Sequence, residues 1–178
     1  MQSGQLKKVI IFILFILLYG CSHSYSVKPF PIKPNLVPEM NVKDSVHIVN
    51  AQDQGKNFVF FSGRGSQWIG DLGEWTGQAA GLLKFEMKKR NITIADDAHK
   101  ILKLAITKGK LSSTFSGIRC IVMLKAETAN GYTKEYEGNH FSHSPFGQQA
   151  RYHAGAGAIT KAVTALLNDK KIISYLEK

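Results

Sequence analysis

The sequence predicts a two-layer α+β domain, in which an antiparallel sheet containing a three-strand meander carries two long helices on one face. Three strand-like segments, residues 99–107, 118–128 and 132–141, have alternating apolar side chains, as expected for strands with one buried face. Apolar side chains recur with helical spacing in residues 74–90 and 148–167. Neither helix can bury its apolar stripe alone, so both are expected to pack on the same face of the sheet.

The chain begins with the features of a bacterial signal peptide. Lys7 and Lys8 precede an uncharged apolar run, residues 9–20, which is shorter than the ~20 residues that a spanning helix requires. The sequence Leu18-Tyr19-Gly20-Cys21 follows and resembles the lipobox, in which a small residue precedes the lipidated cysteine. An uncleaved membrane anchor is the alternative, but the lipobox favours a signal peptide that spans residues 1–20 and is removed.

Cys21 is therefore predicted to be the first residue of the mature protein and to carry diacylglycerol and an N-acyl chain such as palmitate. These chains are sufficient for stable anchoring in a membrane. Ser22 follows, so the aspartate that retains lipoprotein chains in the inner membrane is missing. We therefore expect an outer-membrane lipoprotein whose domain lies in the periplasm.

Residues 21–42 are predicted to be a tether, and residues 43–178 to form a single domain. The tether contains all but one of the chain's prolines and shows no period typical of a strand or helix. Closely spaced prolines favour an extended polyproline II conformation. The alternative is an arm packed along the domain, for which Phe30 and Ile32 supply apolar side chains.

The first half of the domain is predicted to contain two strands, a loop and a helix. Residues 46–51 and 58–61 are short apolar runs typical of strands. Residues 63–73 are rich in glycine and precede the helix of residues 74–90, a context in which phosphate groups bind. The dinucleotide fingerprint and the P-loop pattern are both absent, so we expect a flexible or partner-facing loop with Trp68 exposed.

The second half is predicted to be a meander followed by a helix, residues 148–167, and a short terminal helix, residues 170–178. Asn130-Gly131 predicts a two-residue hairpin turn with positive φ at both residues. Residues 108–117 are interpreted as a polar connection. The apolar positions of these elements predict a core that contains Leu83, Leu104, Cys120, Val122, Leu124, Ile159 and Val163.

No residue pattern in the sequence predicts catalysis. His140, His143 and His153 lie close in sequence, but further ligands at zinc-like spacing are missing. Cys120 is the only cysteine besides Cys21, so we expect a buried thiol and no intramolecular disulfide. The sequence therefore predicts no catalytic residue, no metal ligand and no cofactor.

The chain is basic, with a formal net charge of +10, and the mature protein keeps +8 because the signal peptide contains Lys7, Lys8 and no acid. An exported, lipid-anchored protein is not expected to bind nucleic acid. Anionic lipid or lipopolysaccharide is the expected partner for this charge, and a plain solvated surface is the alternative. The residues expected to face such a partner are Lys88, Lys89, Arg90, Lys108 and Lys110.

Several segments resemble the YajG-like family of Gram-negative envelope lipoproteins. The similarity is closest at residues 82–91, 125–127, 129–136 and 172–176. It implies a fold and an envelope location, and it implies no catalytic residue. We therefore expect a noncatalytic lipoprotein that binds a protein partner or an anionic envelope glycolipid. The alternatives are an enzyme acting on cell-wall or lipid material and an auxiliary subunit of an envelope transport or assembly complex.

Overall fold

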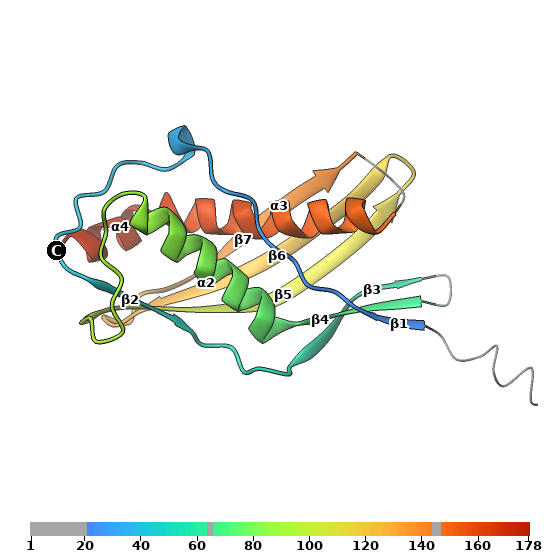
Figure 1. Ribbon diagram of the computed structural model, residues 1–178, viewed down its shortest axis with the longest axis horizontal. Coiled ribbons are helices and arrows are strands. Elements are labelled where there is room, and N and C mark those ends of the chain that lie inside the picture. Colours follow the sequence, from blue (N-terminus) through green and yellow to red (C-terminus); the bar gives the residue numbers. More distant parts are fainter. Residues whose placement is uncertain (1–20, 64–65, 144–146) are drawn as a thin grey trace, which may run out of the picture.

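The computed structural model describes residues 21–63, 66–143 and 147–178. The predicted signal peptide, residues 1–20, lies outside these residues. The structure has an α+β fold, in which a four-stranded sheet and a three-stranded sheet pack with helices (Figure 1). Within the described parts of the chain, none of the helices has the length and apolar character needed to cross a bilayer.

The four-stranded sheet has the strand order β2-β5-β6-β7, formed by β2 (Val46–Asn50), β5 (Lys100–Thr114), β6 (Gly117–Thr128) and β7 (Thr133–Ser142). Strands β5, β6 and β7 pair antiparallel, which confirms the predicted meander. Strand β2 pairs parallel to β5, so the sheet as a whole is mixed. The long segment between β2 and β5 makes this crossover possible, because it contains two further strands and a helix.

Strand β5 is longer than predicted. Residues 108–114, interpreted as part of a polar connection, pair with β6 as far as Thr114 opposite Gly117. A register shift between Ile106 and Lys108 marks a β-bulge, and Leu111 beyond it is buried. The strand continues here because the antiparallel pairing with β6 satisfies its backbone, although its side chains are mostly polar.

Within the glycine-rich segment, residues 66–71 form a strand and not the predicted loop. The three-stranded sheet has the order β1-β4-β3, with β1 (Cys21–Ser24), β3 (Asn57–Gly63) and β4 (Ser66–Asp71). Trp68 is buried within β4, contrary to the expected exposure. Glycine is needed at position 70, because a Cβ there would lie 2.9 Å from the ring of Phe58.

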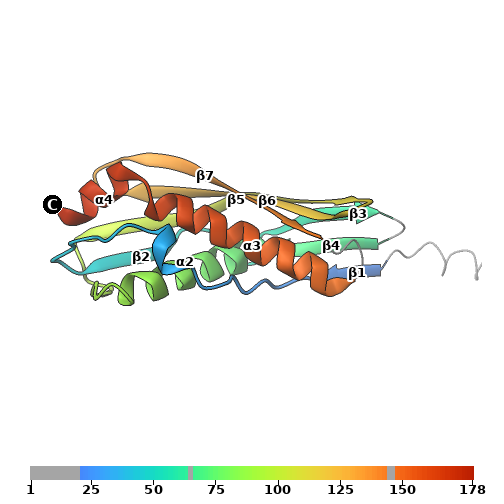
Figure 2. The ribbon, with the colours of Figure 1, turned by 90° about the horizontal axis from the view of Figure 1, so that it is seen from above.

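Helices α2 (Leu72–Lys88) and α3 (Gln148–Leu167) cover one face of the four-stranded sheet (Figure 2), as predicted. Helix α2 packs on β2 and β5, and α3 packs on β6 and β7. Asp71 caps the start of α2 by accepting a 2.8 Å hydrogen bond from the backbone N–H of Glu74. A short helix, α4 (Lys170–Glu177), follows α3.

The proline-containing segment differs from the predicted free tether. Its described side chains Tyr25, Val27 and Ile32 are buried, and Figure 1 shows it crossing the helices. The backbone N–H of Phe30 donates to Thr160 of α3 at 2.9 Å. This is the alternative of an arm packed along the domain. Apolar residues between the prolines account for it, because burying them stabilises the docked arm.

The predicted core is confirmed. All seven of its residues are at most 1% exposed: Leu83, Leu104, Cys120, Val122, Leu124, Ile159 and Val163. Burial raises the pKa of the Cys120 thiol to about 12. Cys120 is therefore protonated at neutral pH and behaves as an apolar core side chain.

The β6–β7 turn contains Asn130-Gly131 but differs from the predicted two-residue type. Gly131 has φ 86°, and among the described residues other than glycine only Asn91 has a positive φ. The backbone N–H of Thr128 donates to the carbonyl of Tyr132 at 2.9 Å, and that of Gly131 donates back to Thr128 at 3.0 Å. The turn is therefore longer, with one left-handed glycine at its end, a common alternative in hairpins.

Candidate anionic-ligand site

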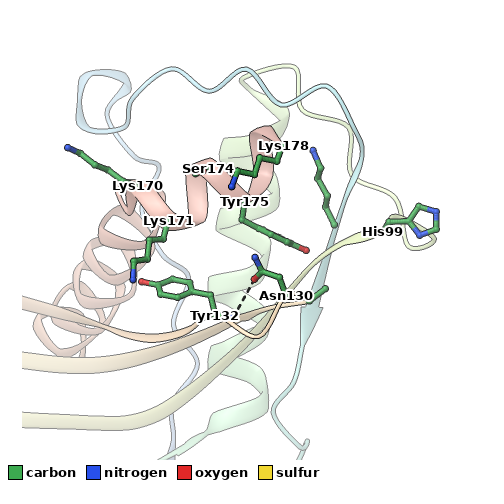
Figure 3. A pocket seen from close by; sticks show the side chains of 10 residues that line it. His99, Asn130, Tyr132, Lys170, Lys171, Ser174, Tyr175 and Lys178 are labelled. Carbon is green, nitrogen blue, oxygen red and sulfur yellow. Dashed lines mark hydrogen bonds between the residues drawn. The ribbon is translucent and has the colours of Figure 1, made fainter.

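An open cavity of about 750 Å³ lies between α4 and the β6–β7 turn (Figure 3). Its lining contains cations, hydrogen-bond donors and two aromatic rings, and none of the described Asp or Glu residues is part of it. The lining residues are His99, Lys100, Ala129, Asn130, Tyr132, Lys170, Lys171, Ser174, Tyr175 and Lys178.

Two tyrosines give the cavity a fixed shape. The hydroxyl of Tyr175 in α4 accepts from the backbone N–H of Ile101 at 2.9 Å and donates to the carbonyl of Ile101 at 3.2 Å. These bonds join α4 to the start of β5. The ammonium of Lys171 lies 5.1 Å from the centre of the Tyr132 ring, within the range of a cation–π interaction.

The cations of the cavity are of two kinds. The ammonium of Lys100 donates to the carbonyl of Leu176 at 2.6 Å and pairs with Asp44 at 2.9 Å, so it holds the fold together. Lys170, Lys171 and Lys178 are exposed, and no ion pair joins any of them to a carboxylate of the described chain. These three lysines are thus able to meet an anionic ligand.

Asp169 supports the cavity from the junction of α3 and α4. Its Oδ2 accepts from Lys134 at 2.6 Å, from Tyr136 at 3.0 Å and from Tyr132 at 3.1 Å. Its Oδ1 caps α4 by accepting from the backbone N–H of Lys171 at 2.8 Å. Burial alone raises the pKa of Asp169, but these hydrogen bonds outweigh it and hold that pKa well below its ordinary value. Asp169 is therefore ionised at neutral pH, and both of its oxygens are in use.

The basic residues predicted at the end of α2 serve partly to hold the structure together. Glu86 is only 1% exposed, and it pairs with Lys89 at 3.4 Å and with Arg90 at 3.0 Å. Its Oε1 also accepts from the backbone N–H of Ile32 in the packed arm. Lys89 and Arg90 thus neutralise a buried carboxylate, while Lys88 remains exposed.

The five predicted basic residues do not form one surface. Lys108 and Lys110 lie in β5 opposite Met123 and Ile121 of β6, on the face that the helices leave uncovered. The residues at the end of α2 belong to the helical layer. The lysines of α4 were not among the predicted residues. The sequence Asn168-Asp169-Lys170-Lys171 could have indicated them, because it places two cations at the start of the predicted terminal helix.

Cys21 and the histidines considered in the sequence, His140, His143 and His153, do not line the cavity. Cys21 begins β1 at the end of the molecule opposite the cavity (Figure 1). In the part of the chain that the structure describes, no three His, Cys, Asp or Glu residues are placed to hold a metal ion. The His140 ring packs against Gly157 of α3, where an added Cβ would lie 2.3 Å from it.

The comparisons with known proteins add a likeness of fold. No family model matches the chain, and no curated protein matches it. The crystal structure of protein XCC0632 from Xanthomonas campestris, described with the family model DUF330, superposes with a TM-score of 0.51 at 13% sequence identity. The match covers 86% of this chain and 96% of that chain. At this identity the likeness supports the α+β fold of the chain and carries no functional detail.

Proposed function

We propose that this protein is a noncatalytic lipoprotein of the cell envelope, held in the outer membrane by a lipid on Cys21, and that it binds an anionic glycolipid in the cavity beside α4. The domain then lies in the periplasm. The single observation that carries the binding function is the composition of the cavity, in which lysines, hydrogen-bond donors and tyrosine rings occur together and no described Asp or Glu side chain is part of the lining.

The chemistry of the cavity suits a phosphorylated sugar. Lys170, Lys171 and Lys178 provide point charges for phosphate groups. Tyr132 and Tyr175 offer apolar ring faces against which a sugar ring can pack, and Asn130 and Ser174 offer hydrogen bonds to hydroxyl groups. Glycolipid headgroups of the bacterial envelope combine these chemical features.

In this proposal the lipid and the ligand lie at opposite ends of the domain. The lipobox-like sequence ends at Cys21, the first residue of β1, so a lipid on Cys21 would be attached at one end. Helix α4 and the β6–β7 turn, which border the cavity, lie at the other end (Figure 1). The resemblance to YajG-like lipoproteins agrees with an envelope location.

A protein partner is the second candidate, and the uncovered face of the sheet favours it. Ile101, Ile121 and Met123 lie on this face and are only partly buried. A sheet face with partly exposed apolar side chains is a common docking surface.

Replacing Cys21 with serine tests the anchor. We expect the parent protein to fractionate with membranes and to incorporate labelled palmitate, because acyl chains on Cys21 hold it there. The Cys21→Ser variant should carry no label and should be washed from membranes by high salt, which leaves the acylated parent in place. Cys120→Ser is the matched control and should remain in the membrane. A Cys21→Ser variant that is as firmly membrane-bound as the parent would contradict the anchor.

Neutralising three lysines tests the cavity. The probe is a phosphorylated disaccharide of the lipid A type, measured by calorimetry at low salt. The triple variant Lys170→Gln, Lys171→Gln and Lys178→Gln should bind about a hundredfold more weakly, because each lysine contributes about 1 kcal/mol near an anionic group.

The matched control is the triple variant Lys28→Gln, Lys33→Gln and Lys84→Gln, which removes the same charge from residues outside the cavity lining. It should bind nearly as the parent does. Binding by the parent should also weaken steeply as salt is added, because screening reduces contacts between exposed charges. Equal losses in the two triple variants would show that only net charge matters, and would refute the cavity as the site.

A further inference from the structure

The β5–β6 turn carries a fully exposed aromatic side chain. The paired residues of this hairpin end at Thr114 and Gly117, so Phe115 and Ser116 form its tip. Phe115 is 102% exposed, whereas the other exposed large apolar side chains of the described chain, Leu36, Val59 and Phe85, are 49–52% exposed. Tight hairpin turns usually contain Gly, Asn or Asp, so turn formation does not explain a phenylalanine at this position.

The tip lies at the same end of the molecule as Cys21. Both views show β1 and the β5–β6 turn at one end of the long axis and α4 at the other (Figures 1 and 2). Strand β5 joins the two ends, from Lys100 in the cavity to Thr114 beside the tip. A strand of 15 residues spans roughly 45–50 Å at about 3.3 Å per residue.

The charge around the tip is basic. Residues 108–119 contain Lys108, Lys110 and Arg119 and no acidic residue, and all three cations are exposed. The acids Glu127, Glu135 and Glu137 of the same sheet lie toward the cavity end, since β6 ends and β7 begins there. An exposed aromatic side chain flanked by cations is typical of segments that bind at the interface of an anionic membrane.

We propose that the tip of the β5–β6 hairpin is a second membrane contact, in which Phe115 enters the bilayer interface and Lys108, Lys110 and Arg119 meet anionic headgroups. The proposal rests on the proposed function in one respect, because the bilayer concerned is the one that holds Cys21. Two contacts at one end orient the long axis of the domain away from that membrane. The cavity is then held on the far side of the domain, turned toward ligands outside the anchoring bilayer.

Tryptophan fluorescence on vesicles tests the contact. The mature chain is coupled through the Cys21 thiol to a maleimide lipid in vesicles of phosphatidylcholine and phosphatidylglycerol, some with brominated acyl chains. Cys120 is 0% exposed and does not compete for the coupling. The Phe115→Trp variant should emit at a shorter wavelength on vesicles than in solution and be quenched by the brominated chains.

The Phe85→Trp variant, which places an indole at an exposed position of α2, is the matched control and should show neither change. The parent, whose Trp68 and Trp75 are buried, gives the background signal. Because the lipid is attached chemically, this result does not depend on lipidation of Cys21 in cells, which the Cys21→Ser fractionation tests separately. If the indole introduced by Phe115→Trp stays as exposed to water on vesicles as the one introduced by Phe85→Trp, the proposal is overturned.

A binding measurement without the lipid provides a second test. The mature chain with Cys21→Ser should bind vesicles containing phosphatidylglycerol. Adding Phe115→Ser should weaken this binding about tenfold, because the phenylalanine side chain is no longer transferred from water into the bilayer interface. Phe85→Ser removes an exposed phenylalanine from α2 and should leave binding unchanged. Equal effects of the two variants would count against a specific role for the tip.

Discussion

Gly138→Ala is expected to destabilise the domain by about 3 kcal/mol or more, although it adds a single methyl group. An added Cβ at position 138 in β7 would lie 1.9 Å from the carbonyl oxygen of Ala158 and 2.8 Å from the backbone nitrogen of Ala162. Both atoms belong to the backbone of α3, so no side-chain rotation relieves the contact. Helix α3 must move away from the sheet instead.

This movement is costly because α3 forms much of the core. Ile159, Val163 and Leu166 are fully buried, and the helix packs directly on β6 and β7. Small residues along the helix, including Ala154 and Ala158, permit the close approach. Moving the whole helix loses many of these contacts at once, and closely packed interiors tolerate such gaps poorly.

Gly81→Ala is the matched control, with an effect of opposite sign. Gly81 lies inside α2, and an added Cβ there has nothing within 4 Å. Alanine is favoured over glycine within a helix by about 0.5–1 kcal/mol, so this variant should be more stable than the parent. Urea unfolding followed by circular dichroism measures both changes. A Gly138→Ala variant as stable as the parent would show that α3 does not pack this closely on β7.

The parts of the fold that depend on local patterns could be predicted from the sequence. The helical spacing of apolar residues was sufficient to predict α3, whose observed bounds equal the predicted residues 148–167. The alternation in β6 placed Cys120, Val122 and Leu124 on the buried face. These predictions succeeded because each pattern reports directly which side chains face the core.

The remaining elements depend on contacts between distant residues. Strand β4 lies within the glycine-rich residues 63–73, and it is a strand because its backbone pairs with both β3 and β1. The arm is ordered because its backbone bonds to Thr160 and Glu86. The residues of β4 and of the arm do not themselves indicate which distant residues they pair with.

The candidate site was missed for a similar reason. Lys170 and Lys171 are predicted correctly as residues of a terminal helix, but the cavity exists only because α4 lies against the β6–β7 turn. Tyr175 makes that contact through Ile101, 74 residues away in sequence. Clustering of basic residues along the chain indicates Lys88, Lys89, Arg90, Lys108 and Lys110, but it does not indicate the layer in which each residue lies.

Asp169→Asn is expected to lower the free energy of unfolding at neutral pH by about 1–3 kcal/mol. Both carboxylate oxygens accept hydrogen bonds, whereas an asparagine side chain offers one acceptor atom and one donor group. In either orientation a donor group faces another donor. A buried donor without an acceptor costs about 1–3 kcal/mol, whereas a lost N-cap costs about 1 kcal/mol. The donor left without an acceptor is either the hydroxyl of Tyr136 or the backbone N–H of Lys171 in the first turn of α4.

The effect should depend on pH with a definite sign. The pKa of Asp169 is lowered in the folded protein, so its ionised form stabilises the fold above the ordinary aspartate pKa of about 4. This contribution is lost as the pH falls from about 4 toward the lowered pKa, because the folded protein must then take up a proton that the unfolded chain already holds. The Asp169→Asn variant has no proton to take up at this position.

The difference in stability between parent and variant should therefore be constant from pH 7 to about pH 5 and shrink below about pH 4. Urea unfolding of both proteins at a series of pH values measures it. Asp97→Asn, at an exposed position, is the control and should change stability little at any pH. A difference between parent and Asp169→Asn that stays constant down to about pH 3, or grows there, would show that Asp169 is not the ionised acceptor that joins α4 to the sheet.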